Sequence, residues 1–147
     1  MTVLAIDPGE TVGIAVFTEK GKALKVEEIP SDEFFDRLAD YTPGKLTTVV
    51  VEDYRLRQGK QMQQTGSRFE TVQCIGAARL FARIHGLDFH RQSPQILTVT
   101  AKHMRIHVGT GHIQDRTSAL LHGYRFFIES RGVTTATLRT LNALNAL

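Results

Sequence analysis

The 147-residue sequence predicts an α/β protein with a mixed five-stranded sheet, in which three antiparallel strands precede parallel strands and helices cover both faces. Three observations lead to this prediction. Three apolar stretches come first, at residues 2–7, 12–18 and 23–29, and only short turns separate them. Two later strands alternate with helical patterns, as expected for parallel strands. Residues 49–51 are consecutive valines, which is typical of a strand covered on both faces.

In the N-terminal half, the first three strands form an antiparallel meander, because the hairpin turn at residues 19–22 is too short for a crossover. A helix begins at Pro30, with acidic residues in its first turn. Residues 42–44, Thr-Pro-Gly, end that helix. The fourth strand follows at residues 47–53 and ends in two acidic residues.

The C-terminal half predicts one more strand between helices. The predicted elements are a helix at 67–85, a strand at 87–90, a helix that opens at Ser93-Pro94, and a long helix at 112–130. Ser67 and Glu70 form a capping box at the start of the first of these helices. Residues 133–147 carry leucines at three-residue spacing and are either a helix or a frayed end.

The composition is that of an ordinary soluble globular protein, with 41% hydrophobic and 22% charged residues. No apolar run approaches the roughly 20 residues that cross a bilayer, and the N-terminus lacks the pattern of a secretory signal. We therefore expect a single domain over residues 1–147, a cytoplasmic location and no membrane partner. Cys74 is the only cysteine, which excludes an internal disulfide, and its helical context predicts a buried, inert thiol.

Three acidic residues stand at the ends of predicted elements. Asp7 ends the first strand, Glu52 ends the fourth, and Asp115 lies in the first turn of the last long helix. The first and fourth strands can be parallel neighbours, so Asp7 and Glu52 can meet at the carboxyl edge of the sheet. Like charges held this close require a cation between them. Gly13 on the second strand is expected to allow close approach of another backbone or of a ligand.

This pattern of carboxylates predicts two Mg²⁺-type ions about 4 Å apart, which bridge a phosphate in line with an attacking water. His112 precedes Asp115 by three residues, so the two are expected to share one helical face. His112 is either a metal ligand or a base that takes a proton from the water.

The formal net charge of +3 is weakly basic and compatible with a polyanion partner. Basic residues are concentrated after Tyr54, where Arg55, Arg57, Lys60 and Arg68 occur without any acidic residue among them. Because this segment directly follows a buried acidic strand, we expect a loop that contacts phosphates rather than a merely solvated loop.

Several motifs, in order along the chain, resemble RuvC Holliday-junction resolvases. They are residues 5–9 with 13–15, residues 50–52, residues 76–79, Ser93-Pro94, and His112-x-x-Asp115 with Ala119-Leu120. The resemblance covers most of the chain. It implies an RNase H-like fold and a Mg²⁺-dependent endonuclease that acts as a homodimer on branched DNA, in recombination and repair, with Mn²⁺ as a substitute ion. It also implies that Asp7, Glu52, His112 and Asp115 form the metal site.

Two features depart from that family. The segment between Thr98 and Gly109 is shorter than the family's usual basic segment, so junction contacts are less expected from it. The family often stacks an aromatic residue on unpaired bases after the second acid. Here Tyr54 lies closer to Glu52 than in the family and Phe69 lies farther away, so one of them, or neither, would have that role. The small residues 76–78 permit close helix packing, so we expect the helix at 67–85 to lie at or near a dimer interface. The alternative is that these residues pack on the protein's own sheet. A compact chain of this kind suits a bacteriophage member, acting in a bacterial cell or a phage-infected host.

Other protein classes fit less well. Ribosomal-RNA-processing nucleases of the same fold share the first motif, but their second motif ends in a Gly-Leu-Pro-like turn rather than in residues 52–54, Glu-Asp-Tyr. ATPases of the sugar-kinase and actin type need a second domain. An inert nucleic-acid-binding module would have lost an acid, and all three are present. His103 and His107 lack a third zinc ligand, so we interpret them as a surface pair.

Overall fold

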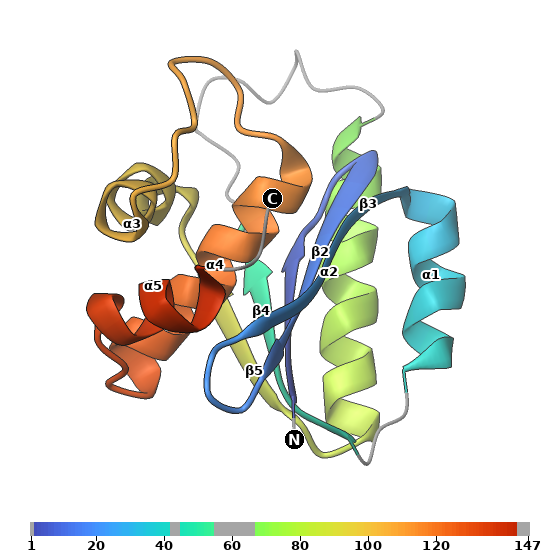
Figure 1. Ribbon diagram of the computed structural model, residues 1–147. Helices are drawn as coiled ribbons and strands as arrows, with labels where there is room; N and C mark the ends of the chain where they lie inside the picture. Colours follow the sequence, from blue (N-terminus) through green and yellow to red (C-terminus); the bar gives the residue numbers. More distant parts are fainter. Residues whose placement is uncertain (1, 42–44, 55–66, 144–147) are drawn as a thin grey trace.

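The computed structural model describes residues 2–41, 45–54 and 67–143, and these build one five-stranded sheet in the order β3-β2-β1-β4-β5 (Figure 1). The strands are β1 Thr2–Asp7, β2 Thr11–Thr18, β3 Ala23–Pro30, β4 Leu46–Glu52 and β5 Asp88–Gln92. β2 pairs antiparallel with β1 and β3, whereas β4 pairs parallel with β1 and β5. The predicted mixed sheet is therefore confirmed, and β1 and β4 are parallel neighbours.

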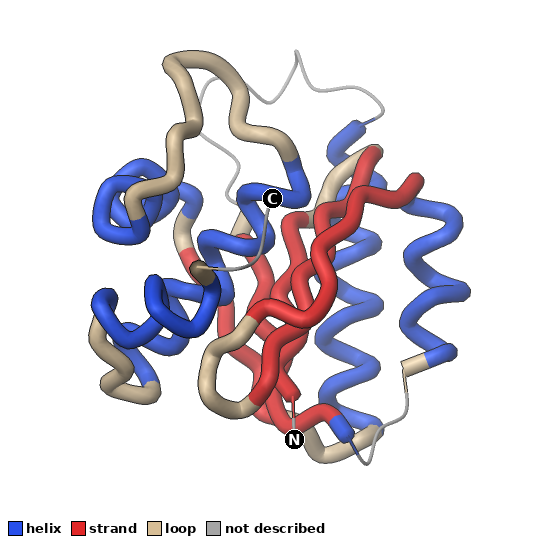
Figure 2. The backbone as a smooth tube through the Cα atoms, in the orientation of Figure 1, coloured by secondary structure: helices blue, strands red, loops and turns tan. Residues whose placement is uncertain are grey.

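Helices cover both faces of the sheet, as predicted. They are α1 Ser31–Asp40, α2 Ser67–Ile84, the 3-10 helix η3 Pro94–Ile96, α3 Leu97–Met104, α4 Asp115–Ser130 and α5 Thr135–Asn142. Figure 2 shows α1 and α2 on one face and α4 on the other, with α3 and α5 outside α4. Over the residues that the structure describes, no helix combines the length and the apolar character needed to cross a membrane.

Two predicted boundaries need correction, and the structure shows a helix in one segment that the sequence leaves undecided. β5 continues to Gln92 because its parallel pairing with β4 extends to the pair of Glu52 and Gln92. α4 begins at Asp115 rather than at residue 112, because Gln114 is extended (φ −56°, ψ 138°) and its carbonyl accepts the first helical bond from Ser118. The undecided C-terminal segment contains the helix α5, which Leu138 anchors with a fully buried side chain.

Two of the three core clusters lie on opposite faces of the central strands, and the third lies between α3 and α4. Along β1, Leu4 and Ile6 belong to the cluster under α1 and α2, whereas Val3 and Ala5 belong to the cluster under α4. This alternation follows the two-residue repeat of a strand. Cys74 is buried in the first cluster as predicted, and burial raises the pKa of its thiol to about 11.

Candidate active site

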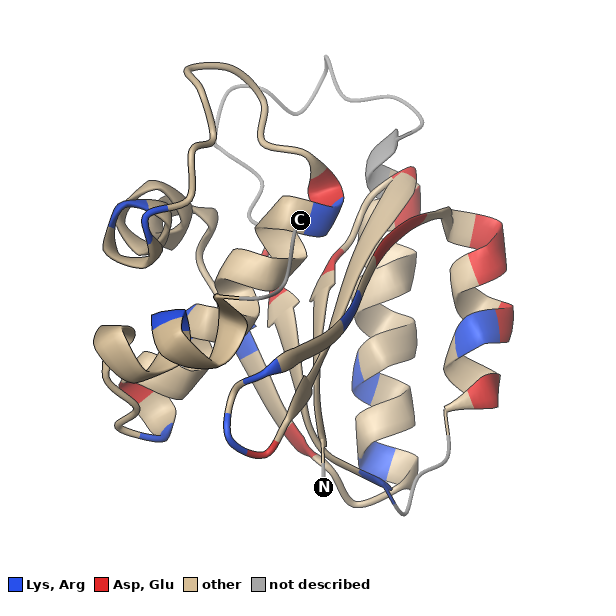
Figure 3. Cartoon of the chain, viewed as in Figure 1, with Lys and Arg blue, Asp and Glu red and all other residues tan. Residues whose placement is uncertain are grey.

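One cavity of about 640 Å³ lies where the carboxyl ends of β1 and β4 meet the first turn of α4. The four predicted site residues all line it: Asp7, Glu52, His112 and Asp115. Figure 3 shows acidic positions at the start of α4 and on the strands near it. Three separate elements therefore bring the predicted acids to one place, as the parallel pairing of β1 and β4 requires.

A row of residues across three strands supports this cavity. Asp7 of β1 pairs with Gly13 of β2, and Gly13 pairs with Glu28 of β3. A Cβ atom on Gly13 would overlap the backbone carbonyl of Asp115, so the first turn of α4 rests directly on this glycine. The predicted close approach of another backbone at Gly13 is confirmed. Glu28 Oε1 accepts a hydrogen bond of 3.2 Å from the backbone N–H of Arg116, which holds the same turn.

The carboxylates of this cavity influence one another. Asp7 is 8% exposed, and burial raises the pKa of its carboxyl to about 8. The charge of Glu52 is the next contribution, Asp115 and Glu28 add smaller ones, and a hydrogen bond with Ser118 acts in the opposite direction. Burial also raises the pKa of Asp115, while His112 opposes that rise and Glu28 adds to it. Among the described residues, the carboxylates of this cavity therefore repel one another.

Glu52 is held by two side chains of α4. Its Oε2 lies 2.8 Å from His122 Nε2 and accepts a hydrogen bond of 3.3 Å from Ser118 Oγ. The other ring nitrogen of His122, Nδ1, lies 2.9 Å from Gln92 Oε1. The neighbouring acid, Asp53, lies 3.6 Å from an Arg91 guanidinium nitrogen instead. Glu52 rather than Asp53 is therefore the acid of this strand end that belongs to the cavity.

His112 reaches the site in a different way from the one predicted. It precedes α4 and does not lie on a helical face, so the expected arrangement was wrong. Its Nε2 nevertheless lies 3.3 Å from Asp115 Oδ1, and its side chain is 84% exposed. His112 is thus an exposed imidazole beside a half-buried carboxylate, and both of its predicted roles stay predictions.

The predicted nucleic-acid contacts are only partly within the described residues. Tyr54 lines the cavity. Phe69 is 71% exposed on the first turn of α2 and is not among the lining residues. Arg55, Arg57 and Lys60 lie outside the described residues, as does the side chain of Arg68.

The donor set of the cavity suits a hard divalent cation. Carboxylates are the ligands that Mg²⁺ prefers. Burial is the main cause of the raised pKa of Asp7, and a cation would offset the further rise that comes from the charge of Glu52. Within residues 2–41, 45–54 and 67–143, however, no three His, Cys, Asp or Glu side chains form a group that could hold an ion as they stand. The acids share a cavity without forming a finished ligand cluster, and the two-ion site stays a prediction.

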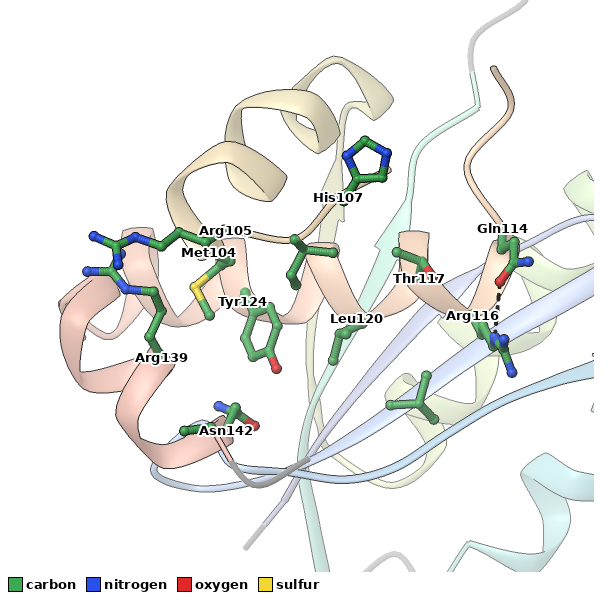
Figure 4. A pocket seen from close by; sticks show the side chains of 13 residues that line it. Met104, Arg105, His107, Gln114, Arg116, Thr117, Leu120, Tyr124, Arg139 and Asn142 are labelled. Atoms are coloured by element: carbon green, nitrogen blue, oxygen red, sulfur yellow. Dashed lines mark hydrogen bonds between the residues drawn. The ribbon is translucent and has the colours of Figure 1, made fainter. Parts of the chain in front are cut away.

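A second cavity of about 840 Å³ is lined by Arg116 of α4, the residue that directly follows Asp115 in the sequence (Figure 4). Arg105 and Arg139 line it as well, and no acidic residue is among its described lining residues. Tyr124 and Leu120 from α4 add apolar surface. This cavity is suited to an anionic group with an apolar part.

Three residues of the site were not predicted from the sequence. Ser118 and His122 follow Asp115 by three and seven residues, a spacing that places all three on one helical face. This spacing could have indicated that Ser118 and His122 lie next to the site. Glu28 is harder to find, because the register irregularity between Val16 and Phe17 decides which residue lies opposite Gly13.

Comparison with known proteins supports the fold. No protein-family model matches the chain, and curated proteins contain no match. The chain is similar to Thermus thermophilus RuvC in complex with a Holliday junction substrate, with a TM-score of 0.67, 16% identity, and coverage of 91% of this chain and 97% of that one. A second Thermus thermophilus RuvC structure gives a TM-score of 0.64, 15% identity, and coverage of 90% and 96%.

At 15–16% identity, the likeness to these two structures establishes the fold of this chain. The chain has an RNase H-like fold. Within that class, its fold is RuvC-like, and the resemblance that the sequence motifs predicted is confirmed at that level.

Proposed function

We propose that this protein is a Mg²⁺-dependent endonuclease that cuts Holliday junctions or other branched DNA. The observation that carries the proposal is the convergence of Asp7, Glu52 and Asp115, from three elements, on one cavity of a RuvC-like fold. The solved RuvC structure with a Holliday junction substrate supports branched DNA as the substrate class. With branched DNA as its substrate, the protein would act in the cytoplasm of a bacterial or phage-infected cell.

In this proposal Asp7, Glu52 and Asp115 are the ligands that would hold Mg²⁺, and Mn²⁺ should substitute. Bound Mg²⁺ would supply Lewis-acid polarisation of the phosphate and a more acidic water. The protein's own part is to hold the carboxylates on rigid strand and helix ends. His112, exposed beside Asp115, would be either a fourth metal ligand or the base that takes a proton from the attacking water.

Contacts to the DNA backbone would come from basic residues near this centre. We assign the first of them to Arg55, Arg57, Lys60 and Arg68, which follow Glu52 in the sequence. Tyr54 on the cavity wall or the exposed Phe69 would stack on an unpaired base. The arginines of the second cavity extend the basic surface away from α4's first turn.

A homodimer is part of the proposal. A four-way junction needs two symmetric nicks, and one chain carries one centre, so a twofold dimer matches the substrate. An exposed apolar stripe on α2 supports this assembly. Its members are Phe69, Val72, Leu80 and Ile84, with exposures of 71%, 56%, 58% and 67%. Gly76 lies between them in sequence, and a Cβ there would meet nothing within 4 Å.

One observation favours a second candidate. Because no finished ligand cluster occurs among the described residues, a module that binds branched nucleic acid without cutting it is the alternative. A nuclease for ribosomal RNA precursors would share the fold, but Glu52-Asp53-Tyr54 differs from the motif of that class.

The experiment that distinguishes these candidates incubates the protein with four-way, Y-shaped, flap and linear DNA and with a structured RNA, with and without Mg²⁺. It measures binding and cutting of each. We expect Mg²⁺-dependent cutting of the branched DNAs and paired nicks in the four-way junction. Tight binding of the junction without cutting in Mg²⁺ or Mn²⁺ would favour the binding module. Preferential cutting of RNA would favour the RNA-processing class.

A further inference from the structure

His122 is a fully buried histidine that contacts a residue of the proposed metal site. It lies on the second turn of α4, has 0% exposure, and has both ring nitrogens engaged. Nε2 lies 2.8 Å from Glu52 Oε2, and Nδ1 lies 2.9 Å from Gln92 Oε1. Gln92 is also the residue of β5 that pairs with Glu52 of β4. The ring therefore connects two adjacent strand ends to the helix above them.

The two contacts to Glu52 reach the same oxygen. His122 Nε2 and Ser118 Oγ both lie within hydrogen-bonding distance of Oε2. Oε1 is therefore the oxygen that can bind a ligand without breaking either contact. A carboxylate whose one oxygen is fixed from behind loses rotational freedom, so less entropy is lost when the other oxygen binds an ion.

We propose that His122, supported by Gln92, is a positioning residue that fixes the Glu52 carboxylate in the orientation in which it binds a divalent cation. This inference rests on the proposed function, because it assigns Glu52 to the metal. It adds residues that touch neither the ion nor the DNA. Removing a residue that hydrogen-bonds to a metal ligand typically lowers metal affinity by about 10–100-fold.

The competing explanation is that His122 only ties α4 to β4 and β5. Such a role predicts lower stability in variants but unchanged metal affinity in the folded protein. The two explanations differ in a quantity other than activity, namely Mn²⁺ affinity in the absence of DNA. Thermal unfolding then verifies that each variant is folded at the temperature of the binding measurement.

The experiment measures Mn²⁺ binding to the full chain by titration calorimetry and by the electron paramagnetic resonance signal of free Mn²⁺. His122→Leu fills the space but has no N–H, whereas His122→Gln keeps an amide N–H donor on a side chain of similar reach. Gln92→Leu removes only the support behind the ring and provides a milder variant should His122→Leu unfold. Leu121→Val is the matched control, because Leu121 is equally buried next to His122 and packs on α3 instead.

We expect His122→Leu to weaken Mn²⁺ binding about 10–100-fold, His122→Gln to recover most of it, and Leu121→Val to leave it unchanged. We also expect cleavage by His122→Leu to recover at high Mg²⁺. Gln92→Leu should weaken binding by a smaller factor. Unchanged Mn²⁺ affinity in folded His122→Leu, or in Gln92→Leu where His122→Leu does not fold, would overturn this inference alone. A wild-type protein that binds no Mn²⁺ and cuts no DNA would overturn the proposed function together with it.

Discussion

Gly13 and Asp115 are in backbone contact, although 102 residues separate them in the sequence, and this contact positions the acidic turn of α4 on the sheet. The carbonyl of Asp115 occupies the place where a side chain at position 13 would begin. Because Gly13 pairs with Asp7, the same contact sets how close the helix acid lies to the strand acid. The arrangement of Asp7 and Asp115 in the cavity therefore requires a glycine at position 13.

Gly13→Ala should displace the first turn of α4. The added methyl group would overlap backbone rather than a flexible side chain, so we expect the free energy of unfolding to fall by about 1–3 kcal/mol or more. Gly111→Ala is the control, because a Cβ there meets nothing within 4 Å, and its effect should stay within about 0.5 kcal/mol. Urea unfolding measures both. Equal effects of the two substitutions would contradict the contact.

The strand ends of the site could be predicted from the sequence, because parallel pairing of β1 and β4 follows from their order and apolar pattern. Asp7 and Glu52 were found in this way, and Asp115 was found as an acid in the first turn of the last long helix. Glu28, Ser118 and His122 were not found. Helical spacing from Asp115 was a usable signal for Ser118 and His122, but their contacts with Glu52 depend on how α4 packs on the strand ends, and the role of Glu28 depends on a register irregularity. Such relationships arise from tertiary packing, which short sequence patterns do not encode.

The error at His112 has the same origin. A helical spacing of three residues suggested a shared face, but extended Gln114 delays the start of α4. The two side chains still meet, because the loop before α4 passes the cavity.

The stability of the metal-free protein should decrease as pH rises from about 4 to about 8. The pKa of Asp7 is raised from 3.8 to about 8 in the folded state, so the folded chain keeps a proton that the unfolded chain has lost. The stabilisation is complete below the unfolded pKa and is lost as pH rises through the folded pKa. Melting temperatures across this range should therefore fall in the wild type.

Asp7→Asn should flatten that pH profile, and Mg²⁺ should stabilise the wild type more at the upper end of the range than at the lower end. Asp36→Asn, an exposed acid on α1, should leave the profile as it is. Parallel profiles for the wild type and Asp7→Asn would contradict the raised pKa.

Replacing Arg55, Arg57 and Lys60 by Ala should weaken binding of all DNA sequences alike. Each lost phosphate contact should reduce the slope of log K against log salt by about one unit. The control replaces Lys20, Lys22 and Lys45, which lie at the opposite ends of the strands from Asp7 and Glu52. The slope of log K against log salt could be unchanged when Arg55, Arg57 and Lys60 are replaced but smaller in Arg105→Ala. That result would indicate that the phosphate is bound at the second cavity instead.

If the proposed dimer forms through α2, Leu80→Glu should convert it to a monomer and abolish the proposed paired nicking, because the substitution places a charge in the exposed apolar stripe of α2. Leu24→Glu is the matched control, since Leu24 is 56% exposed on β3 and Leu80 is 58% exposed. Sedimentation equilibrium at tens of micromolar without DNA measures the association. A wild-type monomer that still nicks both strands together would exclude a preformed dimer.

The most direct test of the account measures junction binding and Mg²⁺-dependent cleavage on the same sample of Asp7→Asn. Asp7 is the most buried acid of the cavity, and the amide keeps its size while removing its charge. We expect cleavage to fall by about 100-fold or more, with junction affinity unchanged or higher. Asp36→Asn should cut and bind like the wild type. Near-normal Mg²⁺-dependent cutting by Asp7→Asn would contradict the assignment of this cavity as the nuclease centre.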